Sequence, residues 1–506
     1  MTPQNFDFTT SSTPQNFENK NAPPPPPPPS PQNLEKSGGK CKNKVENTFK
    51  HQKKTSPHRI ILPNGLRVVY EKSPSTLPLT SIQCFVNMGS IHETKDVRGI
   101  SHIIEHMAFK GTKKLPTSTD ISQPYDKTGA YMNAYTDKQL TCYVIKCQND
   151  FFQICLSVLS DMLFHSKFER AEFEKEYDVV IEEARINVDD ILTTVDESIT
   201  KILYKGSSYE NPVDHLSYHI PKRVDFQKAV EIYKNYYVPK NMVLSIVSSI
   251  PYKSIIDTIK KTYFWKEHIS RNTSRLPPPN LYLEPFREPQ IVIEKKGGME
   301  STNVAIGFRT CNMFSNDKYT LNLLKFILIG PIMSRFFRIL REENGLTYRT
   351  SISINNYEHS GDFTIFTQVD PNKIMRGNRD KVGLLPIIAG IFKDLLKNGV
   401  TVEEFKTAKG YLKGIIMRHF EDNDNLAEHN GEHFLFDSGE PDPGNENVFS
   451  YLKKYDVCYE KITREDVHSV IHKYFILENL CIFILGTKVP SIKSVSDVFI
   501  GSLGRR

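Results

Sequence analysis

Short apolar segments separated by turn residues recur along the chain from Arg59 onward. Residues 60–70 read as two strands joined by an Asn64-Gly65 turn, the dipeptide that tight hairpins favour. Further apolar stretches of strand length lie at residues 81–88 and 303–311. Longer segments with helical periodicity separate these strands, so the pattern predicts an α+β protein.

The pattern also indicates a duplication. The segment Tyr-Tyr-Val-Pro-Lys-Asn241 precedes the apolar run 242–247, and Tyr-Phe-Ile-Leu-Glu-Asn479 precedes a similar run at 480–485. Both read as a helix that passes into a strand, with Asn at the turn. Two related α+β domains account for this repetition; chance similarity between short apolar strands is the alternative.

Proline marks the predicted domain boundaries. Residues 1–57 contain seven consecutive prolines and are predicted to be a disordered tail, with docking to a proline-binding domain as the alternative role. Five prolines fall within residues 275–289, which is typical of a linker. We therefore divide the chain into the tail (1–57), a first domain (58–274), the linker (275–289) and a second domain (290–506).

Composition and charge exclude several protein classes. Of the formal net charge of +6, the tail holds +4, since it has eight Lys against four acidic residues. The rest is near neutral, unlike a nucleic-acid-binding protein. No apolar run reaches the ~18 residues that a membrane span needs. No signal sequence or Arg-rich presequence is present, so we expect a cytoplasmic protein, with the mitochondrial matrix as the alternative.

The cysteines fit a reducing compartment. Eight are scattered along 506 residues, which does not suggest a disulfide framework. Cys142 and Cys147 lie five residues apart on a predicted strand, so they should point to opposite faces and be buried structural residues.

The segment His102-Ile-Ile-Glu105-His106 carries the clearest chemical signal. Residues four apart share one face of a helix, so the two imidazoles can bind one metal ion together. Glu105 lies on nearly the same face, where it can hold a metal-bound water. This is the inverted order of the usual zincin motif.

The same pattern occurs again at His429-Asn-Gly-Glu432-His433. Here the middle residues are a turn dipeptide that disfavours a helix interior. We therefore predict that His429 and His433 are exposed polar residues rather than metal ligands.

Zinc catalysis normally uses three protein ligands and leaves a fourth position for water. The helical segment 168–191 is the candidate source of the third ligand. Glu176 and Glu183 are seven residues apart, two turns along one stripe of that helix. Spacing alone does not choose between Glu182 and Glu183.

Together these motifs resemble those of the inverzincin metallopeptidases, the pitrilysin, insulinase and mitochondrial processing peptidase group. The segments 87–93, Lys110-Gly-Thr112 and 235–242 add to the resemblance. It implies two related domains, each a mainly antiparallel sheet flanked by helices, of which the second is inactive and closes the site. It further implies one Zn²⁺ per chain held by His102, His106 and Glu183, with Glu105 catalytic and Glu176 supporting.

Two further segments resemble functional parts of that family. The segment 129–136 resembles the strand beside the metal whose edge pairs with an extended peptide, which implies that Asn133 and Ala134 bind substrate. A purely structural strand is the alternative. Arg341 and Tyr348 resemble an Arg–Tyr pair that reaches across to the substrate and the developing oxyanion.

The resemblance implies a zinc metalloendopeptidase that hydrolyses extended peptides or unfolded segments in a closed chamber. Family members of this length close their chamber by forming a homodimer or a heterodimer with a related subunit. The alternatives are a non-catalytic structural or assembly subunit, as in respiratory core proteins, and a scaffold that acts through its tail. The presence of all four residues, His102, Glu105, His106 and Glu183, favours the enzyme.

Overall fold

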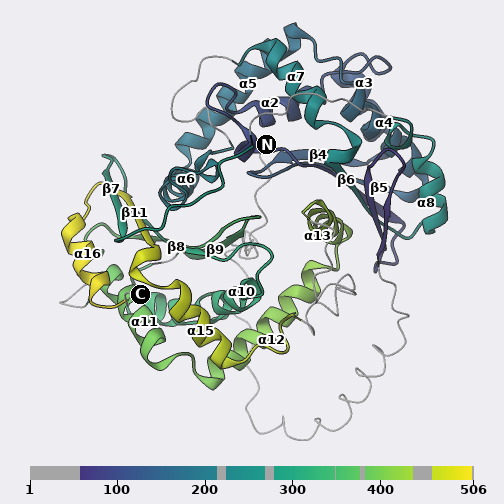
Figure 1. The fold of residues 1–506 in the computed structure, drawn as a ribbon. Helices are drawn as coiled ribbons and strands as arrows, with labels where there is room; N and C mark the ends of the chain where they lie inside the picture. Colours follow the sequence, from purple (N-terminus) through teal and green to yellow (C-terminus); the bar gives the residue numbers. More distant parts are fainter. Residues whose placement is uncertain are drawn as a thin grey trace, which may run out of the picture.

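The computed structural model in Figure 1 describes residues 57–213, 224–267, 278–347, 349–376, 382–436 and 458–503. The tail predicted for residues 1–57 lies outside these residues up to position 56, and Tyr348 also lies outside them. The described chain forms two sheets, each with its own layer of helices.

The first sheet has six strands in the order β1-β2-β6-β3-β5-β4. All neighbouring strands are antiparallel except β2 and β6, which are parallel. The predicted Asn64-Gly65 hairpin is confirmed between β1 and β2, with Gly65 at φ +87°. The strands are β1 His58–Ile61, β2 Arg67–Lys72, β3 Leu79–Val86, β4 Tyr131–Thr136, β5 Thr141–Gln148 and β6 Met242–Ser248.

The second sheet repeats this arrangement, without an equivalent of β1 in the described part of the chain. Its order is β7-β11-β8-β10-β9, and only β7 and β11 are parallel. The strands are β7 Gln290–Lys295, β8 Thr302–Thr310, β9 Thr350–Asn356, β10 Gly361–Val369 and β11 Leu480–Gly486.

The repeated Asn has the same contact in both halves. The Nδ2 of Asn241 donates a hydrogen bond to the carbonyl oxygen of Tyr236 at 3.0 Å, and that of Asn479 donates to the carbonyl oxygen of Tyr474 at 3.1 Å. Each bond joins the end of a helix to the turn that leads into the next strand, which lies in the interior of its sheet. Together with the shared strand order, this confirms two related α+β domains.

Helices lie along both sheets (Figure 1). In the first half they are α2 Ile100–Met107, α3 Ser118–Thr128, α4 Phe152–His165, α5 Arg170–Asp189, α6 Ile191–Leu203, α7 Phe226–Tyr236, α8 Tyr252–Ile259 and α9 Tyr263–Lys266. In the second half they are α10 Asp317–Leu328, a π-helix Phe337–Glu343, α11 Leu384–Asn398, α12 Val402–His419, α13 Asn423–Leu435, α15 Arg464–Tyr474 and α16 Ile492–Ile500. Short 3₁₀ turns lie at Ser90–His92, Asn149–Phe151, Ser208–Glu210, Pro239–Asn241 and Leu477–Asn479.

The two faces of each sheet are buried against different partners. Alternate strand residues point to opposite faces, so Cys147 joins the core beneath the helices of the first half, whereas Cys142 packs with Phe85 on the other face. Both thiols are buried, as predicted. The second face of the first sheet therefore also needs an apolar cover.

That cover comes from the other half of the chain. Helix α13, from the second half, packs Phe434 and Leu435 against Phe85 and Val243 of the first sheet. It lies on the opposite side of this sheet from α2, α5 and α7 (Figure 1). Helix α6, from the first half, reciprocally buries its apolar residues against β8 and β11 of the second sheet. Each domain thus contributes one helix that packs on the sheet of the other domain, and these two contacts join the domains.

The structure corrects the prediction for the second His-x-x-Glu-His motif. Its residues belong to the continuous helix α13, and His429 and His433 are half-buried rather than exposed. The local preference of Asn-Gly for a turn is overridden by packing: Asn430 donates a hydrogen bond of 2.7 Å to the buried Glu71, and Gly431 lies against the Phe85 ring.

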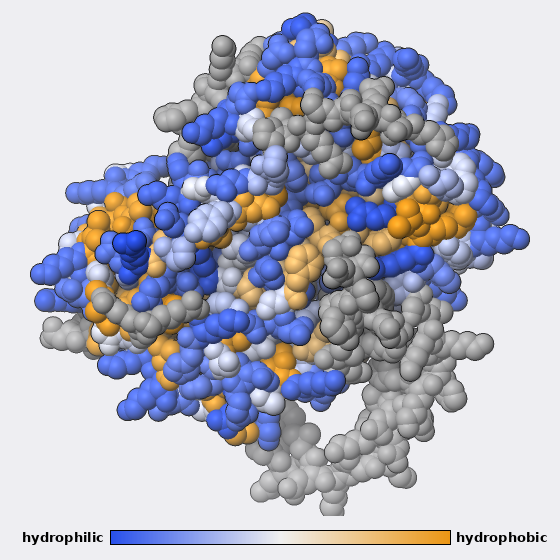
Figure 2. Space-filling view, in the orientation of Figure 1, coloured by the Kyte–Doolittle hydropathy of each residue, from blue (hydrophilic) through white to orange (hydrophobic). Residues whose placement is uncertain are grey.

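Among the described residues, no helix is both long and apolar enough to cross a membrane. Hydrophobic residues on the face drawn in Figure 2 form separate orange patches between hydrophilic ones.

Gly431→Ala should destabilise the protein, because a Cβ at this position would overlap the Phe85 ring and force α13 away from the sheet. We expect a loss of about 1–3 kcal/mol in the free energy of unfolding, the usual cost of overpacking. Gly414→Ala, in the interior of α12 with no atom near the added methyl, is the matched control and should stabilise by about 0.5–1 kcal/mol. Denaturant unfolding of both variants measures this. Equal effects of the two substitutions would contradict the close approach of α13.

Candidate metal centre

Helix α2 presents the first two candidate ligands. Its buried residues Ile103 and Ile104 anchor it in the core of the first half. The backbone enters the helix through Gly99 at φ +79°, a left-handed conformation that favours glycine. The burial of Ile103 and Ile104 thus sets the direction in which His102 and His106 point.

The carboxylate of Glu93 holds the start of this helix. It accepts hydrogen bonds from the backbone N–H groups of Gly99 at 2.6 Å and Ser101 at 2.9 Å, which otherwise have no partner inside the helix. Burial raises the pKa of Glu93 to about 7, although these two N–H groups oppose the shift. Sequence reasoning gave Glu93 no role, because the turn that returns it to the helix start is not visible in a local pattern.

Helix α5 provides the third candidate ligand and packs directly on α2. Its buried stripe of Phe173, Tyr177, Val180 and Ala184 turns it toward the core of the first half. Glu176 and Glu183 lie beside this stripe and point to α2, whereas Glu182 points to solvent and pairs with Arg185. The phase of the helix therefore selects Glu183 over Glu182.

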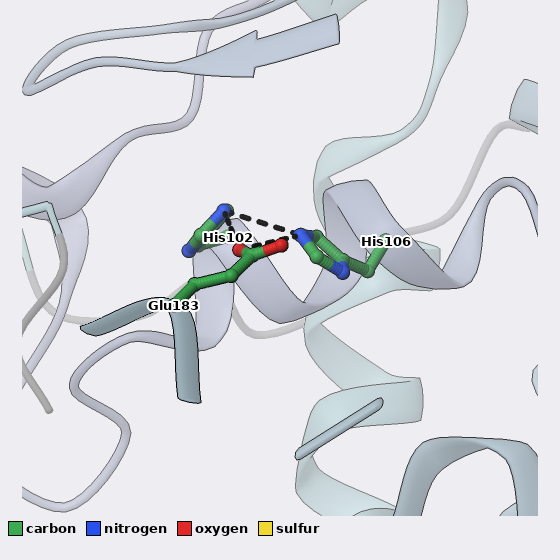
Figure 3. A group of neighbouring side chains, drawn as sticks. All are labelled: His102, His106 and Glu183. Atoms are coloured by element: carbon green, nitrogen blue, oxygen red, sulfur yellow. Dashed lines mark hydrogen bonds and ion pairs between the residues drawn. The ribbon is translucent and has the colours of Figure 1, made fainter. Parts of the chain in front are cut away.

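Three donor atoms converge between these helices (Figure 3). The Nε2 atoms of His102 and His106 are 3.2 Å apart, and Oε2 of Glu183 lies 3.7 Å from the first and 3.5 Å from the second. Two imidazoles and a carboxylate form a common ligand set of catalytic zinc sites.

The spacing of the donors fits zinc. Tetrahedral zinc with bonds of about 2.0–2.2 Å holds its ligand atoms about 3.3–3.6 Å apart. The three separations in the structure, 3.2, 3.5 and 3.7 Å, lie within about 0.1 Å of that range. The residues present therefore fit a three-ligand zinc centre with a fourth position left for water.

A second layer of contacts orients His106. Its Nδ1 lies 3.1 Å from Oε2 of Glu176, and Oε1 of the same carboxylate lies 2.6 Å from Nζ of Lys110. Burial raises the pKa of Glu176, but the bonds to His106 and Lys110 outweigh it and hold the pKa below its ordinary value. An ionised Glu176 can accept the Nδ1 proton of His106, which leaves Nε2 available to a metal ion.

Glu105 lies beside the donor cluster without belonging to it. Its side chain is buried, and Oε2 accepts a hydrogen bond of 2.6 Å from the hydroxyl of Thr136 on β4. Burial raises the pKa of Glu105, against the opposing effect of His102, Thr136 and His106. A buried carboxylate with a raised pKa is suited to accept and return a proton. Thr136 fell within a recognised segment of the sequence but was not singled out.

Strand β4 forms the edge of the first sheet next to α2, so one side of its backbone has no strand partner among the residues that the structure describes. The Oδ1 of Asn133 accepts a hydrogen bond of 2.9 Å from the N–H of Ala134, and its Nδ2 donates to the hydroxyl of Tyr131 at 2.8 Å. Asn133 thus shields a backbone donor at the edge of the sheet. The edge position is compatible with pairing to an extended peptide.

Arg341 has side-chain contacts with residues of its own helix. It belongs to the π-helix of the second half, is largely exposed, and its guanidinium lies 4.9 Å from the centre of the Phe337 ring. Within the described residues, no hydrogen bond or ion pair connects Arg341 to His102, His106 or Glu183. The predicted partner Tyr348 lies outside these residues.

The second histidine pair does not assemble a comparable set. The rings of His429 and His433 are 4.7 Å apart, the same separation as those of His102 and His106. Across the described ranges, however, only His102, His106 and Glu183 bring three metal-ligating side chains together.

Two family models match consecutive parts of the chain. The model described as insulinase (peptidase family M16) matches residues 67–215, and the model described as peptidase M16 inactive domain matches residues 223–412. Together they cover more than half of the 506 residues.

Curated relatives carry matching names. An uncharacterized zinc protease of Bacillus subtilis, YmxG, is 29% identical over 377 residues, which is 74% of this chain and 88% of that protein. An uncharacterized zinc protease of Mycobacterium leprae is 25% identical over 415 residues, which is 82% of this chain and 88% of that protein.

Solved structures share the fold. A protease from Helicobacter pylori superposes with a TM-score of 0.75 at 19% identity, covering 86% of this chain and all of that chain. A Pseudomonas fluorescens structure, titled as a peptidase M16 inactive domain, gives a TM-score of 0.71 at 16% identity, with 86% and 99% coverage. The predicted fold class, two α+β domains with sheets flanked by helices, is confirmed.

Glu183→Gln should lower the zinc content of the protein far more than Glu182→Gln. Only the first substitution removes a donor from the three-atom cluster, since Glu182 faces solvent beside Arg185. After dialysis against a weak chelator, we expect close to one zinc per chain in the Glu182→Gln variant and much less than one in Glu183→Gln. Elemental analysis measures both, and equal zinc retention would refute the assignment of the third ligand.

Proposed function

Because this chain belongs to the insulinase family of peptidases, family M16, we propose that it is a zinc metalloendopeptidase with one Zn²⁺ per chain. The observation that carries the proposal is the convergence of His102, His106 and Glu183 at tetrahedral spacing, with Glu105 buried beside them. The zinc protease names of the relatives support the same conclusion.

In the proposed reaction, the chain's own residues bind the metal and move one proton. A zinc ion bound by the three ligands would polarise the scissile carbonyl and lower the pKa of a water molecule from 15.7 towards ~7. Glu105 takes a proton from the attacking water and returns it to the leaving amine, so the peptide bond breaks and one water is consumed. Thr136 orients the carboxylate of Glu105 for both transfers.

The proposed substrate is an extended peptide or an unfolded segment. It would add as a strand to the edge of β4, where Asn133 and Ala134 supply backbone and side-chain contacts. Since main-chain hydrogen bonds provide most of the affinity in this mode, sequence demand should be low. The Asn133 side chain has to release the Ala134 N–H before a substrate carbonyl can accept it.

We further propose that Arg341 and Tyr348 stabilise the oxyanion when the second domain closes over the first. In the described conformation Arg341 is exposed, so this role requires closure around the substrate. A homodimer, or a heterodimer with a related subunit, would complete the closed chamber. A molar mass near 58.1 kDa for a fully active sample in light scattering would contradict the dimer. The cytoplasmic location stays a prediction.

Glu105→Gln should retain zinc and lose peptide cleavage. The amide cannot accept the proton from water, and loss of a general base commonly costs 10²–10⁴-fold in rate, so we expect turnover to fall by about three orders of magnitude. Cleavage of a mixed library of unstructured peptides, followed by mass spectrometry, measures this.

Glu182→Gln is the matched control, an isosteric change at an exposed carboxylate that should leave turnover unchanged. Wild-type cleavage should also stop when zinc is chelated. Undiminished cleavage by zinc-loaded Glu105→Gln would refute the mechanism. A wild-type chain that binds stoichiometric zinc yet cleaves nothing would mean either that a partner subunit is missing or that the chain is a non-catalytic structural subunit.

A further inference from the structure

One charged side chain at the metal centre has no role in the proposed reaction. Lys110 follows α2 by three residues, and its Nζ lies 2.6 Å from Oε1 of Glu176. The other oxygen of that carboxylate, Oε2, lies 3.1 Å from Nδ1 of His106. The three side chains form a chain that runs from the protein surface to a proposed ligand.

The middle member of this chain needs a cation. Glu176 is buried, and a buried carboxylate is costly unless it is paired and hydrogen-bonded. The Nδ1–H of a neutral histidine provides one hydrogen bond but no full charge. The Lys110 ammonium supplies the positive charge and takes the oxygen that His106 does not use, which fixes the rotation of the carboxylate.

The loop after α2 holds Lys110 in place. Gly111 adopts φ +117°, and a Cβ there would lie closer than van der Waals contact to the carbonyl oxygen of Pro116. Thr112 is fully buried and donates a hydrogen bond of 2.5 Å to the carboxylate of Asp161 on α4. Its hydroxyl oxygen also accepts the N–H of Leu115 at 2.9 Å. Each residue of Lys110-Gly111-Thr112 thus has a separate part: the contact, the turn and the anchor.

We propose that Lys110 is a positioning residue of the metal centre, which orients Glu176 so that Glu176 can hold His106 with Nε2 directed at the metal. The inference rests on the proposed zinc ligation by His106. It differs from a general structural role because it requires that Lys110 act through Glu176 alone.

A double-mutant cycle on zinc affinity tests this route. The variants are Lys110→Met, Glu176→Gln and the double variant, each made metal-free in the full chain and titrated with zinc against a chromophoric chelator. Removal of such an outer contact typically costs 10–100-fold in metal affinity, so we expect Lys110→Met to weaken zinc binding by about 10-fold. In the Glu176→Gln background the same change should weaken it by less than about 2-fold.

Two matched variants separate charge from packing. Lys110→Arg keeps a cation beside Glu176 and should recover most of the affinity. Lys113→Met, an exposed lysine of the same loop, should leave the affinity unchanged. Circular dichroism confirms folding, and Lys110→Gln is the second neutral variant if Lys110→Met does not fold.

The outcomes distinguish this inference from the proposed function. If wild type binds zinc tightly and Lys110→Met binds it equally well, or if the two single losses multiply in the double variant, the role of Lys110 is refuted and the zinc site stands. If the wild type binds no zinc, or if Glu183→Gln binds zinc as well as the wild type does, both proposals are refuted.

Discussion

The packing of α2 on α5 is the contact on which the candidate metal centre depends. The two helices belong to segments separated by more than 60 residues, and their donor atoms meet only because each helix buries its own apolar stripe in one core. Ile103 and Ile104 set the rotation of α2, and Phe173, Tyr177 and Val180 set that of α5. A rotation of either helix by one residue position, about 100°, would turn a ligand out of the site. The core is therefore the part of the protein that fixes the geometry of the donors.

Within the described residues, only the first half has this geometry. Both sheets share their strand order and the Asn contact between helix and strand, yet α10, at the position of α2, carries no histidine. Besides the proposed roles of Arg341 and Tyr348, the second half supports the first sheet structurally. Through α13 it covers the second face of the first sheet, and Glu428 of that helix accepts a hydrogen bond of 3.0 Å from Tyr135 on the edge strand β4. The proposed peptide-binding edge is thus held from both domains.

Much of this could be predicted from the sequence, where local spacing and helix geometry suffice. The spacing of His102, Glu105 and His106 predicts their common face, and the repeated Tyr-to-Asn segments predict the duplication. The choice of Glu183 over Glu182 needed the resemblance to a family, because two adjacent residues fit a spacing argument equally well until the buried stripe of α5 is known.

Other features depend on contacts between distant residues. The turn preference of Asn430-Gly431 predicts a break in the helix. Instead, two contacts with residues more than 340 positions earlier stabilise a continuous helix: Gly431, which has no side chain, packs against the Phe85 ring, and Asn430 donates a hydrogen bond to the Glu71 carboxylate. The cap that Glu93 provides and the contact of Lys110 with Glu176 likewise need the turns that return these residues to α2 and α5. Such turns, which bring Glu93 and Lys110 back to these helices, cannot be predicted from local composition or periodicity.

The most direct test of the account is the position of the metal itself. Crystals of the zinc-loaded chain, measured at energies on either side of the zinc absorption edge, would locate the ion by anomalous scattering. The account predicts one peak per chain, about 2.0–2.2 Å from Nε2 of His102, Nε2 of His106 and a carboxylate oxygen of Glu183. Zinc held by other residues, or no peak between these three atoms, would contradict it.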